Sequence, residues 1–533
     1  MIEITGGNLT VAQVVSVAHD REPVAPLSEA VRERMRASRE WLAGMVESGE
    51  ATVYGVNTGF GPLASTGVQA GDLHRLSRNL ILNCCAGVGP PLSDELVRAM
   101  MVIRANTLAI GCSGVRSELG DTYIAMLNRG VTPEVPSKGS LGASGDLAPL
   151  AHIAVVMTRG GDIEPDGFSG YARYDSQRLT GAEAMERAGI PRLVPGPKEG
   201  LALTNGTTFM VAAGALGASA GRHLLSHAEL AGALSFEALE GLTESLHPAL
   251  HEAARQPGQA ELAARLRTIL AGSELANADP ERVQDAYSVR CISQVLGPIS
   301  DAIDFVHSRF ESLLNGSSDN PLVFADKSHD GAWTTVSGGN FHGEGPALWL
   351  DFLGIAASEI ASLSERRVFR LLTPELNAGL PSMLVPVPGL DSGLMVAQYT
   401  AAALVSDNKT LAHPDSVDSI PSSANQEDHV SMGANGARHA LEILDNVRSV
   451  LAIELLCAAQ AIDLREGGPG RLSPVTAAVH ASIREAIPFL KHDRPLTPDI
   501  EAAAELIRSG DLLAAAEEAA GAKIWPQEAH PNG

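Results

Sequence analysis

One stretch in the C-terminal half decides the fold class: residues 437–464 read ARHALEILDNVRSVLAIELLCAAQAIDL. Its apolar side chains recur every three or four residues, at Ala437, Leu441, Leu444, Val447, Leu451, Leu455, Ala458 and Ile462. This spacing is typical of one apolar face of an α-helix. At 1.5 Å per residue the helix would be roughly 40 Å long, which suits one rod of a large helical bundle.

Other stretches carry the same kind of pattern. Residues 346–372 and 287–314 also predict long helices, and Pro298 is expected to kink the second. Ser473-Pro474 and the run from Thr497 predict two further helix starts. Residues 201–221 carry no charge, and this uncharged run is as long as a membrane span. Its threonines, asparagine and glycines favour a buried core helix instead.

The sequence therefore predicts a mainly α protein in three parts. An N-terminal mixed portion, residues 1–200, alternates short helical runs with Gly/Pro-rich loops and carries the loop discussed below. A central bundle of long helices covers residues 201–466, and a C-terminal helical cap covers residues 467–533. Long striped helices often bury part of their surface against other subunits, so we expect an oligomer.

Composition excludes several classes of protein. The 533-residue chain has 39 Lys+Arg against 63 Asp+Glu, a net charge of −24, whereas nucleic acids and anionic membranes select basic surfaces. We therefore expect neither as a partner. The five cysteines form no CxxC pair and no secretion signal precedes Thr5, so reduced thiols in the cytoplasm are expected. The histidines show no metal-ligand spacing, and no metal site is predicted.

The loop GSLGASGDLAPL, residues 139–150, carries the most distinctive chemistry. The Gly145 amide nitrogen is unhindered and can approach the Ala143 carbonyl carbon if the loop is bent tightly. Closure with loss of water gives a five-membered imidazolone. Dehydration of Ser144 then leaves an exocyclic methylidene, a strong electrophile. A bulkier neighbour would oppose the closure, and only Ser or Cys can eliminate to the alkene.

This loop resembles the signature of the aromatic amino acid ammonia-lyases and 2,3-aminomutases, which build the 4-methylidene-imidazol-5-one (MIO) group autocatalytically. The resemblance runs from Tyr54 to about Arg465 and is closest to the histidine ammonia-lyases. Further matching blocks follow in the family's order, at residues 54–61, 201–207, 283–290, 318–322, 338–343, 364–367 and 423–433.

The resemblance implies a role for each matching residue. Ala143, Ser144 and Gly145 would form the MIO group, and Asp146 would assist the dehydration of Ser144 or hold the loop. Tyr54 matches the general base. The residues expected to line the site beside the MIO group or the substrate are Asn205, Gln284, Tyr287, Arg290 and Phe341, of which Arg290 would pair with the substrate carboxylate through its planar fork of donors.

Two positions bear on the substrate. Glu427 matches the residue that faces the substrate imidazole in histidine-using relatives, where a carboxylate can accept an N–H that a phenyl ring lacks. Relatives acting on histidine or tyrosine commonly carry a Ser-His pair where this chain has Asn83-Cys84, so Cys84 loses or replaces one contact to the substrate ring. Ala286 also stands where histidine lyases usually have proline.

The implied function is an MIO-dependent ammonia-lyase that converts L-histidine to urocanate. The alternative is a 2,3-aminomutase that returns ammonia to Cβ of an aromatic amino acid, most naturally histidine. A non-catalytic helical scaffold would have no reason to keep Tyr54, Ser144 and Arg290. Addition of the substrate amine to the methylidene and attack by the substrate ring are both compatible with these residues. The resemblance further implies a homotetramer with shared active sites and a small amino acid as substrate.

Overall fold

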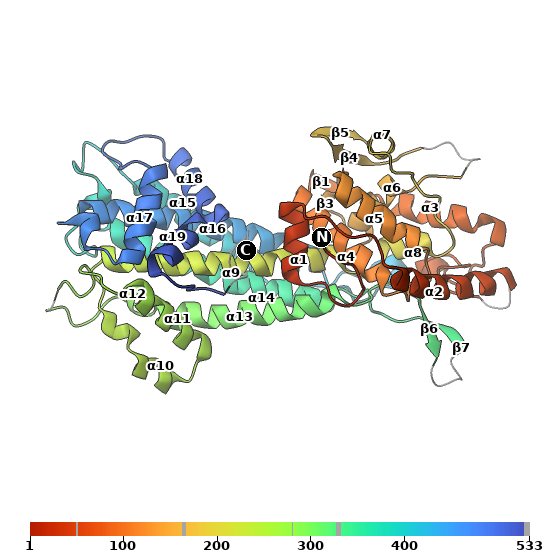
Figure 1. Cartoon of the computed structure of the whole chain (residues 1–533), viewed down its shortest axis with the longest axis horizontal. Coiled ribbons are helices and arrows are strands. Elements are labelled where there is room, and N and C mark those ends of the chain that lie inside the picture. The colour runs from red at the N-terminus through yellow and green to blue at the C-terminus, as the bar shows by residue number, and fades with distance from the viewer. Residues whose placement is uncertain (49–51, 162–166, 280, 327–331, 527–533) are drawn as a thin grey trace. The chain divides into compact units, whose positions relative to one another are not determined.

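The computed structural model describes residues 1–533 apart from 49–51, 162–166, 280, 327–331 and 527–533. Most of the described chain is helical, which confirms the predicted fold class (Figure 1). Contacts between Cα atoms divide the chain into two units. Unit 1 comprises Met1–Leu216, His307–Asp351 and Pro414–Arg438, and unit 2 comprises Gly217–Val306, Phe352–His413 and His439–Gly533. This division differs from the expected boundaries at 200 and 466, because each unit combines three separate stretches of the chain.

Four long helices take part in both units: α9 (Thr208–Ala238), α13 (Ile292–Leu314), α14 (Glu344–Leu372) and α16 (Gly433–Leu464). They confirm the helices expected over 346–372 and 437–464. The helix expected over 287–314 is divided at Cys291 into α12 (Tyr287–Arg290) and α13, which contains Pro298.

Glycines let α9 pack closely against its neighbours. A Cβ atom added at Gly214 would lie 2.0 Å from the Phe310 ring of α13. At Gly217, an added Cβ would touch Leu353 of α14 at 3.0 Å and Leu444 of α16 at 3.5 Å. These contacts place α9 against all three of the other long helices (Figure 1). Side chains at these positions would force the helices apart.

The described part of unit 1 adds eight shorter α-helices to its share of the long ones: α1 (Val11–Val15), α2 (Glu29–Ser48), α3 (Leu73–Cys84), α4 (Asp94–Ala109), α5 (Ser117–Arg129), α6 (Leu147–Met157), α7 (Gly181–Arg187) and α8 (Glu199–Thr204). Its core includes α4, which is buried continuously from Leu96 to Ala109, and α6, buried from Ala148 to Met157. The buried run of α4 contains two arginines, Arg98 and Arg104.

The strands of unit 1 form small antiparallel sheets. One pairs β1 (Val88–Pro91) with β3 (Pro136–Lys138). A second has the order β2-β4-β5, from β2 (Thr132–Pro133), β4 (Tyr171–Tyr174) and β5 (Gln177–Thr180). The third is a hairpin of β6 (Leu322–Asp326) and β7 (Ala332–Val336), with Leu322 opposite Val336.

Unit 2 completes its bundle with shorter helices: α10 (Pro248–Ala254), α11 (Pro257–Ile269), α12, α15 (Met395–Leu411), α17 (Pro474–Ala486), α18 (Thr497–Ser509) and α19 (Asp511–Ala520). The starts expected near Ser473 and Thr497 are confirmed. The Ser473 hydroxyl accepts a hydrogen bond from the Thr476 N–H, and Pro474 fills the first helical position, where no N–H is needed.

The uncharged run 201–221 is a buried helical segment, as expected, but it is broken. Helix α8 ends at Thr204, Asn205 adopts an extended backbone, and α9 begins at Thr208. Among the described residues, α14 is the one helix long and apolar enough to cross a membrane, and 61% of its most apolar window is buried, as in a core helix.

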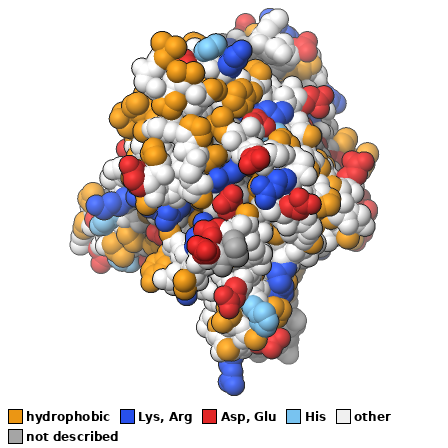
Figure 2. Space-filling model, turned by 90° about the vertical axis from the view of Figure 1, so that its left-hand side faces the viewer, with side chains coloured by type: hydrophobic (Ala, Val, Ile, Leu, Met, Phe, Trp, Pro, Cys, Tyr) orange, Lys and Arg blue, Asp and Glu red, His pale blue; other side chains and the backbone are white. Residues whose placement is uncertain are grey.

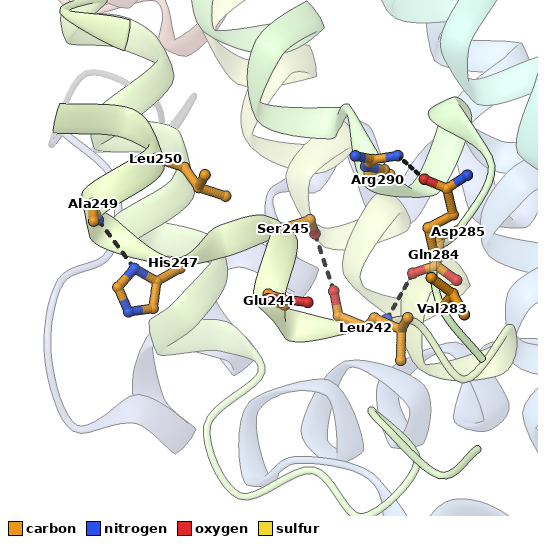
Figure 3. Close-up of a pocket in the computed structure, with 10 residues that line it drawn as sticks. All are labelled: Leu242, Glu244, Ser245, His247, Ala249, Leu250, Val283, Gln284, Asp285 and Arg290. Atoms are coloured by element: carbon orange, nitrogen blue, oxygen red, sulfur yellow. Dashed lines mark hydrogen bonds between the residues drawn. The ribbon is translucent and has the colours of Figure 1, made fainter. Parts of the chain in front are cut away.

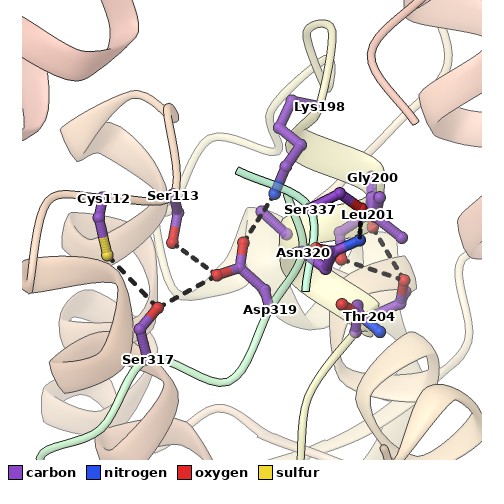
Figure 4. A network of polar contacts seen from close by, with 12 residues as sticks. Cys112, Ser113, Lys198, Gly200, Leu201, Thr204, Ser317, Asp319, Asn320 and Ser337 are labelled. Carbon is purple, nitrogen blue, oxygen red and sulfur yellow. Dashed lines mark hydrogen bonds and ion pairs between the residues drawn. The ribbon is translucent and has the colours of Figure 1, made fainter. Parts of the chain in front are cut away.

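A buried ion pair fixes the start of α8 (Figure 4). Lys198 Nζ donates to Asp319 Oδ2 at 2.7 Å, and both side chains are 0% exposed. The other carboxylate oxygen of Asp319 accepts the Ser113 hydroxyl at 3.1 Å. The network ties the chain before α8 to the segment before β6, which lies more than a hundred residues away in the sequence.

Asp319→Ala should lower the free energy of unfolding by about 3–5 kcal/mol, because it leaves the Lys198 ammonium buried without its carboxylate. Chemical denaturation followed by circular dichroism measures the change. Arg36→Ala is the control, since it breaks an exposed pair with Glu29 at 3.2 Å and should change stability by less than about 1 kcal/mol. Equal effects of the two substitutions would contradict this assignment.

Candidate active site

The loop that contains Ala143, Ser144 and Gly145 lies directly against the bend between α8 and α9. Gly145 has a φ of +75° and forms an isolated bridge with Gly206. A Cβ added at Gly145 would lie 2.2 Å from the Gly206 carbonyl oxygen. A glycine is therefore required at this position, both by its positive φ and by the close approach of the Gly206 backbone.

Ser144 is held at both of its oxygens. Its hydroxyl donates to Glu427 Oε1 at 2.6 Å, and the other carboxylate oxygen of Glu427 accepts the Ser422 hydroxyl at 2.7 Å. Its carbonyl oxygen accepts from Asn205 Nδ2 at 2.8 Å and from the Gly206 N–H at 3.3 Å. The structure thus brings three of the predicted site residues, Ser144, Asn205 and Glu427, into direct contact.

Asp146 anchors the loop to the start of α9. Its carboxylate accepts the Met210 N–H at 3.0 Å and the Ser140 hydroxyl at 3.3 Å. Complete burial raises the pKa of Asp146 to about 7, while the hydrogen bonds from the helix backbone oppose that rise. A carboxylate at this place caps the N-terminus of α9, where the helix dipole favours negative charge.

The segment that carries Phe341 touches the same loop. The Gly343 N–H donates to the Gly142 carbonyl at 3.1 Å, and the Ser431 hydroxyl donates to the same oxygen at 3.2 Å. His342, next to Phe341, stacks on the His429 ring at a centroid distance of 5.7 Å. The segment that carries Phe341 therefore lies next to the loop that contains Ser144.

Tyr54 reaches this group through a neighbouring loop. Its hydroxyl oxygen accepts the Gly61 N–H at 3.2 Å. An added Cβ at Gly61 would lie 2.8 Å from the Ser423 hydroxyl, and Ser423 follows the serine that binds Glu427. The Tyr54 loop thus borders the Glu427 segment, although none of the described hydrogen bonds joins Tyr54 itself to Ser144.

Cys84 is the last residue of α3, and Cys85 caps that helix. Burial raises the pKa of Cys84 to about 11 and that of Cys85 to about 12. Both are therefore protonated thiols near neutrality, without the lowered pKa of a nucleophilic cysteine. None of the described contacts joins Cys84 to Ser144.

The remaining predicted residues, Gln284, Tyr287 and Arg290, lie together in unit 2. Arg290 Nη1 donates to Gln284 Oε1, and the two side chains line a hollow of about 470 Å³ (Figure 3). Tyr287 is 75% exposed and Val283 is 88% exposed. The same hollow is also lined by six residues that precede α11 in the chain: Leu242, Glu244, Ser245, His247, Ala249 and Leu250.

Buried polar side chains fix the position of this second group. Asp285 accepts the Leu242 N–H at 2.7 Å. The Arg367 guanidinium, paired with Glu454 inside the bundle, also reaches the Ser288 carbonyl at 3.5 Å. The segment from Gln284 to Arg290 is thereby held at Asp285 and Ser288, which lie between the two predicted residues.

Two residues of the first group were not among the predicted ones. Ser422 holds Glu427, and Arg104 donates through Nη2 to the Asn205 carbonyl at 2.7 Å. A signal for Arg104 is present in the sequence, since an arginine inside the mostly apolar stretch 99–105 needs buried partners. Within the described residues, no group of three or more His, Cys, Asp or Glu side chains is arranged to hold a metal ion.

Comparison with known proteins gives a consistent result. The family model described as aromatic amino acid lyase matches residues 9–485. The chain is 48% identical over 522 residues to the histidine ammonia-lyase of Sorangium cellulosum, covering 97% of this chain and 99% of that protein.

Solved structures agree. The chain superposes on histidine ammonia-lyase from Trypanosoma cruzi with a TM-score of 0.88 and 37% identity, covering 100% of this chain and 97% of that one. It superposes on tyrosine aminomutase from Streptomyces globisporus with a TM-score of 0.89 and 35% identity, covering 97% and 98%. The chain therefore belongs to the aromatic amino acid lyase family.

Proposed function

We propose that this carbon–nitrogen lyase eliminates ammonia from L-histidine to give urocanate. The observation that carries the proposal is the 2.6 Å contact between the Ser144 hydroxyl and the Glu427 carboxylate. It puts a carboxylate that can accept an imidazole N–H beside the atom where the electrophile would form. The high identity to histidine ammonia-lyases over nearly the whole chain supports the same substrate.

The residues present fit the MIO group. A bond from Gly145 N to the Ala143 carbonyl carbon would enclose the backbone of Ser144, so the Ser144 carbonyl would become the ring carbonyl. That oxygen already accepts two hydrogen bonds, from Asn205 Nδ2 and the Gly206 N–H. When formed, the group supplies an electrophilic methylidene carbon that helps the substrate lose its amino group. Donors aimed at a carbonyl where negative charge develops are a common catalytic device.

Each remaining residue would act on the substrate. Tyr54 would take the proton from Cβ, and Arg290 would bind the carboxylate as a bidentate donor. Loss of the Ser144 hydroxyl would leave Glu427 Oε1 without its donor, free to accept the substrate imidazole N–H. Asn205 Oδ1 is buried and has no partner among the described residues, which leaves it available to a substrate N–H.

The complete site would require more than one copy of the chain in a homotetramer. The group around Arg290 and Tyr287 faces solvent in a single chain, although Tyr287 and Val283 are largely apolar. Helix α14 exposes a stripe at Leu348, Phe352 and Ile355, and Figure 2 shows apolar side chains at the surface of one face of the molecule. Exposed apolar side chains that line up along a helix are suited to packing against another subunit. We expect the assembly in the cytoplasm, without nucleic acid or membrane partners.

The second candidate is a 2,3-aminomutase. It is favoured by the structural likeness to tyrosine aminomutase. Incubation with L-histidine and separation of the products distinguishes the two reactions, since a lyase releases urocanate and an aminomutase releases β-histidine.

The purified protein should weigh two water molecules less than its sequence mass, with the deficit in a peptide that contains Ala143-Ser144-Gly145. Intact-mass and peptide mass spectrometry measure it. Ser144→Ala should abolish the deficit and nearly all turnover while leaving the circular dichroism spectrum unchanged, because the change removes one hydroxyl from a loop. A wild-type protein of full sequence mass would rule out the MIO group.

Mixed oligomers should show whether sites are shared. Tyr54→Phe and Arg290→Met are each expected to be nearly inactive. After the two variants are dissociated, mixed and reassembled, part of the activity should return, because some sites would combine an intact Tyr54 with an intact Arg290. Each variant carried alone through the same cycle is the control. No recovery in oligomers verified as mixed would contradict sites built from these two residues of different subunits.

Glu427→Gln should lower kcat/KM for L-histidine by about 10- to 100-fold, the equivalent of a charged hydrogen bond worth about 1.5–3 kcal/mol. Residual turnover of L-phenylalanine, which has no ring N–H, should fall far less.

Cys84→His should alter rate or substrate range without abolishing activity. If the wild type ignored histidine and consumed tyrosine or phenylalanine, the substrate assignment would be wrong although the MIO group could still be present.

A further inference from the structure

We propose that Arg104 is a positioning residue for the electrophile, acting through the peptide group that joins Asn205 to Gly206. The inference rests on the proposed function, because the oxygen that it acts on becomes a ring carbonyl only if the MIO group forms. Arg104 touches neither substrate nor Ser144, so its effect must pass through the residues between them.

Two hydrogen bonds connect Arg104 to the Ser144 carbonyl oxygen. Arg104 Nη2 donates to the Asn205 carbonyl oxygen at 2.7 Å and also to the Ala202 carbonyl. The N–H of the same Asn205–Gly206 peptide group donates to the Ser144 carbonyl oxygen at 3.3 Å. The cation therefore binds one end of a peptide group whose other end binds the prospective ring carbonyl.

Such an arrangement strengthens the second hydrogen bond. A positive charge on the carbonyl oxygen polarises the peptide group and makes its N–H a better donor, and the effect is larger in a low-dielectric interior. Arg104 is 0% exposed, so solvent does not screen its charge. The Ser144 carbonyl is thus polarised through a chain of two hydrogen bonds that begins at a buried cation.

Arg104 also determines where Asn205 lies. The opposite end of α8 is fixed by Lys198, paired with Asp319, and by Glu199, which accepts Arg116 Nη2 at 2.6 Å. Arg104 fixes the end that delivers the Asn205 amide to Ser144. The fit is tight, because a Cβ added at Gly206 would lie 2.8 Å from Arg104 Nη1.

The buried guanidinium of Arg104 destabilises the fold more than a neutral side chain would, so a purely structural role does not explain it. Its Nε and Nη1 are buried and have no hydrogen-bond partner among the described residues. A buried charge that is incompletely paired lowers the stability of the fold. Burial accordingly lowers the pKa of Arg104, against the opposing influence of Asp319, Tyr123 and Asp146. A neutral side chain could fill this space without that cost, which points to a use for the charge itself.

The chain provides a matched control on the same helix. Arg98 is also buried and donates to backbone carbonyls, those of Val17 and Leu127, but none of these contacts involves Asn205, Gly206 or Ser144. Arg98→Met and Arg104→Met therefore remove the same buried group from α4. Only the second should affect Ser144.

The experiment compares wild type, Arg98→Met, Arg104→Met, Arg104→Gln and Arg104→Lys. For each full-length protein, circular dichroism and thermal unfolding report folding, intact mass reports the fraction of chains that lack two waters, and kinetics on L-histidine report kcat and KM separately. We expect Arg98→Met to keep the wild-type mass deficit and kcat. Arg104→Met should leave a substantial fraction of chains undehydrated and lower kcat of the matured fraction by about 10- to 100-fold, the range expected for misplaced catalytic groups. Arg104→Lys should recover part of both.

A wild-type mass deficit and kcat in folded Arg104→Met overturns the inference. If Arg104→Met does not fold, Arg104→Gln, which keeps a donor without the charge, is read in the same way. Failure of all three Arg104 variants to fold, with Arg98→Met folded, would assign Arg104 to general stability and overturn the inference as well. A wild-type protein without the deficit would instead refute the proposed function.

Discussion

The site depends on the close approach of two backbone segments, one at Gly145 and the other at Gly206. No side chain fits between them, since an added Cβ at Gly145 would lie 2.2 Å from a carbonyl oxygen. Because the strands touch, the Ser144 carbonyl meets the Gly206 N–H and the Asn205 amide directly. The loop is consequently bent where a bond between backbone atoms would have to form, and the bend is held by other parts of the chain.

Buried polar groups maintain this approach, whereas apolar packing supplies the bulk of the framework. Helices α4 and α6 are each buried along nearly their whole length, yet the contacts that orient the site are polar: Arg104 of α4 with the end of α8, Lys198 with Asp319, and Asp146 with the start of α9. Apolar contacts are non-directional and tolerate small shifts. Hydrogen bonds to buried groups have strict geometry and a high cost when broken, so they determine positions more narrowly than apolar contacts do.

Helical periodicity was sufficient to predict most of the fold. The stripes that predicted α14 and α16 arise from local spacing, which any helix must obey, and Ser473 with Pro474 marked the start of α17. The two interleaved units were not predictable, because they depend on which distant stretches pack together. The same holds for the site: motif resemblance identified Ser144, Asn205 and Glu427, but the Arg104 contact joins residues 101 positions apart.

The hydrogen bond between Ser144 and Glu427 links substrate binding to the maturation of the protein. While Ser144 keeps its hydroxyl, the chain occupies its own carboxylate, and an incoming imidazole N–H would have to compete with a group tethered 2.6 Å away. With the role proposed for Glu427, the newly folded protein would act as its own competitive inhibitor. Dehydration of Ser144 would remove the inhibitor and create the electrophile in one event, so that the substrate is admitted only when the chemistry to transform it is in place.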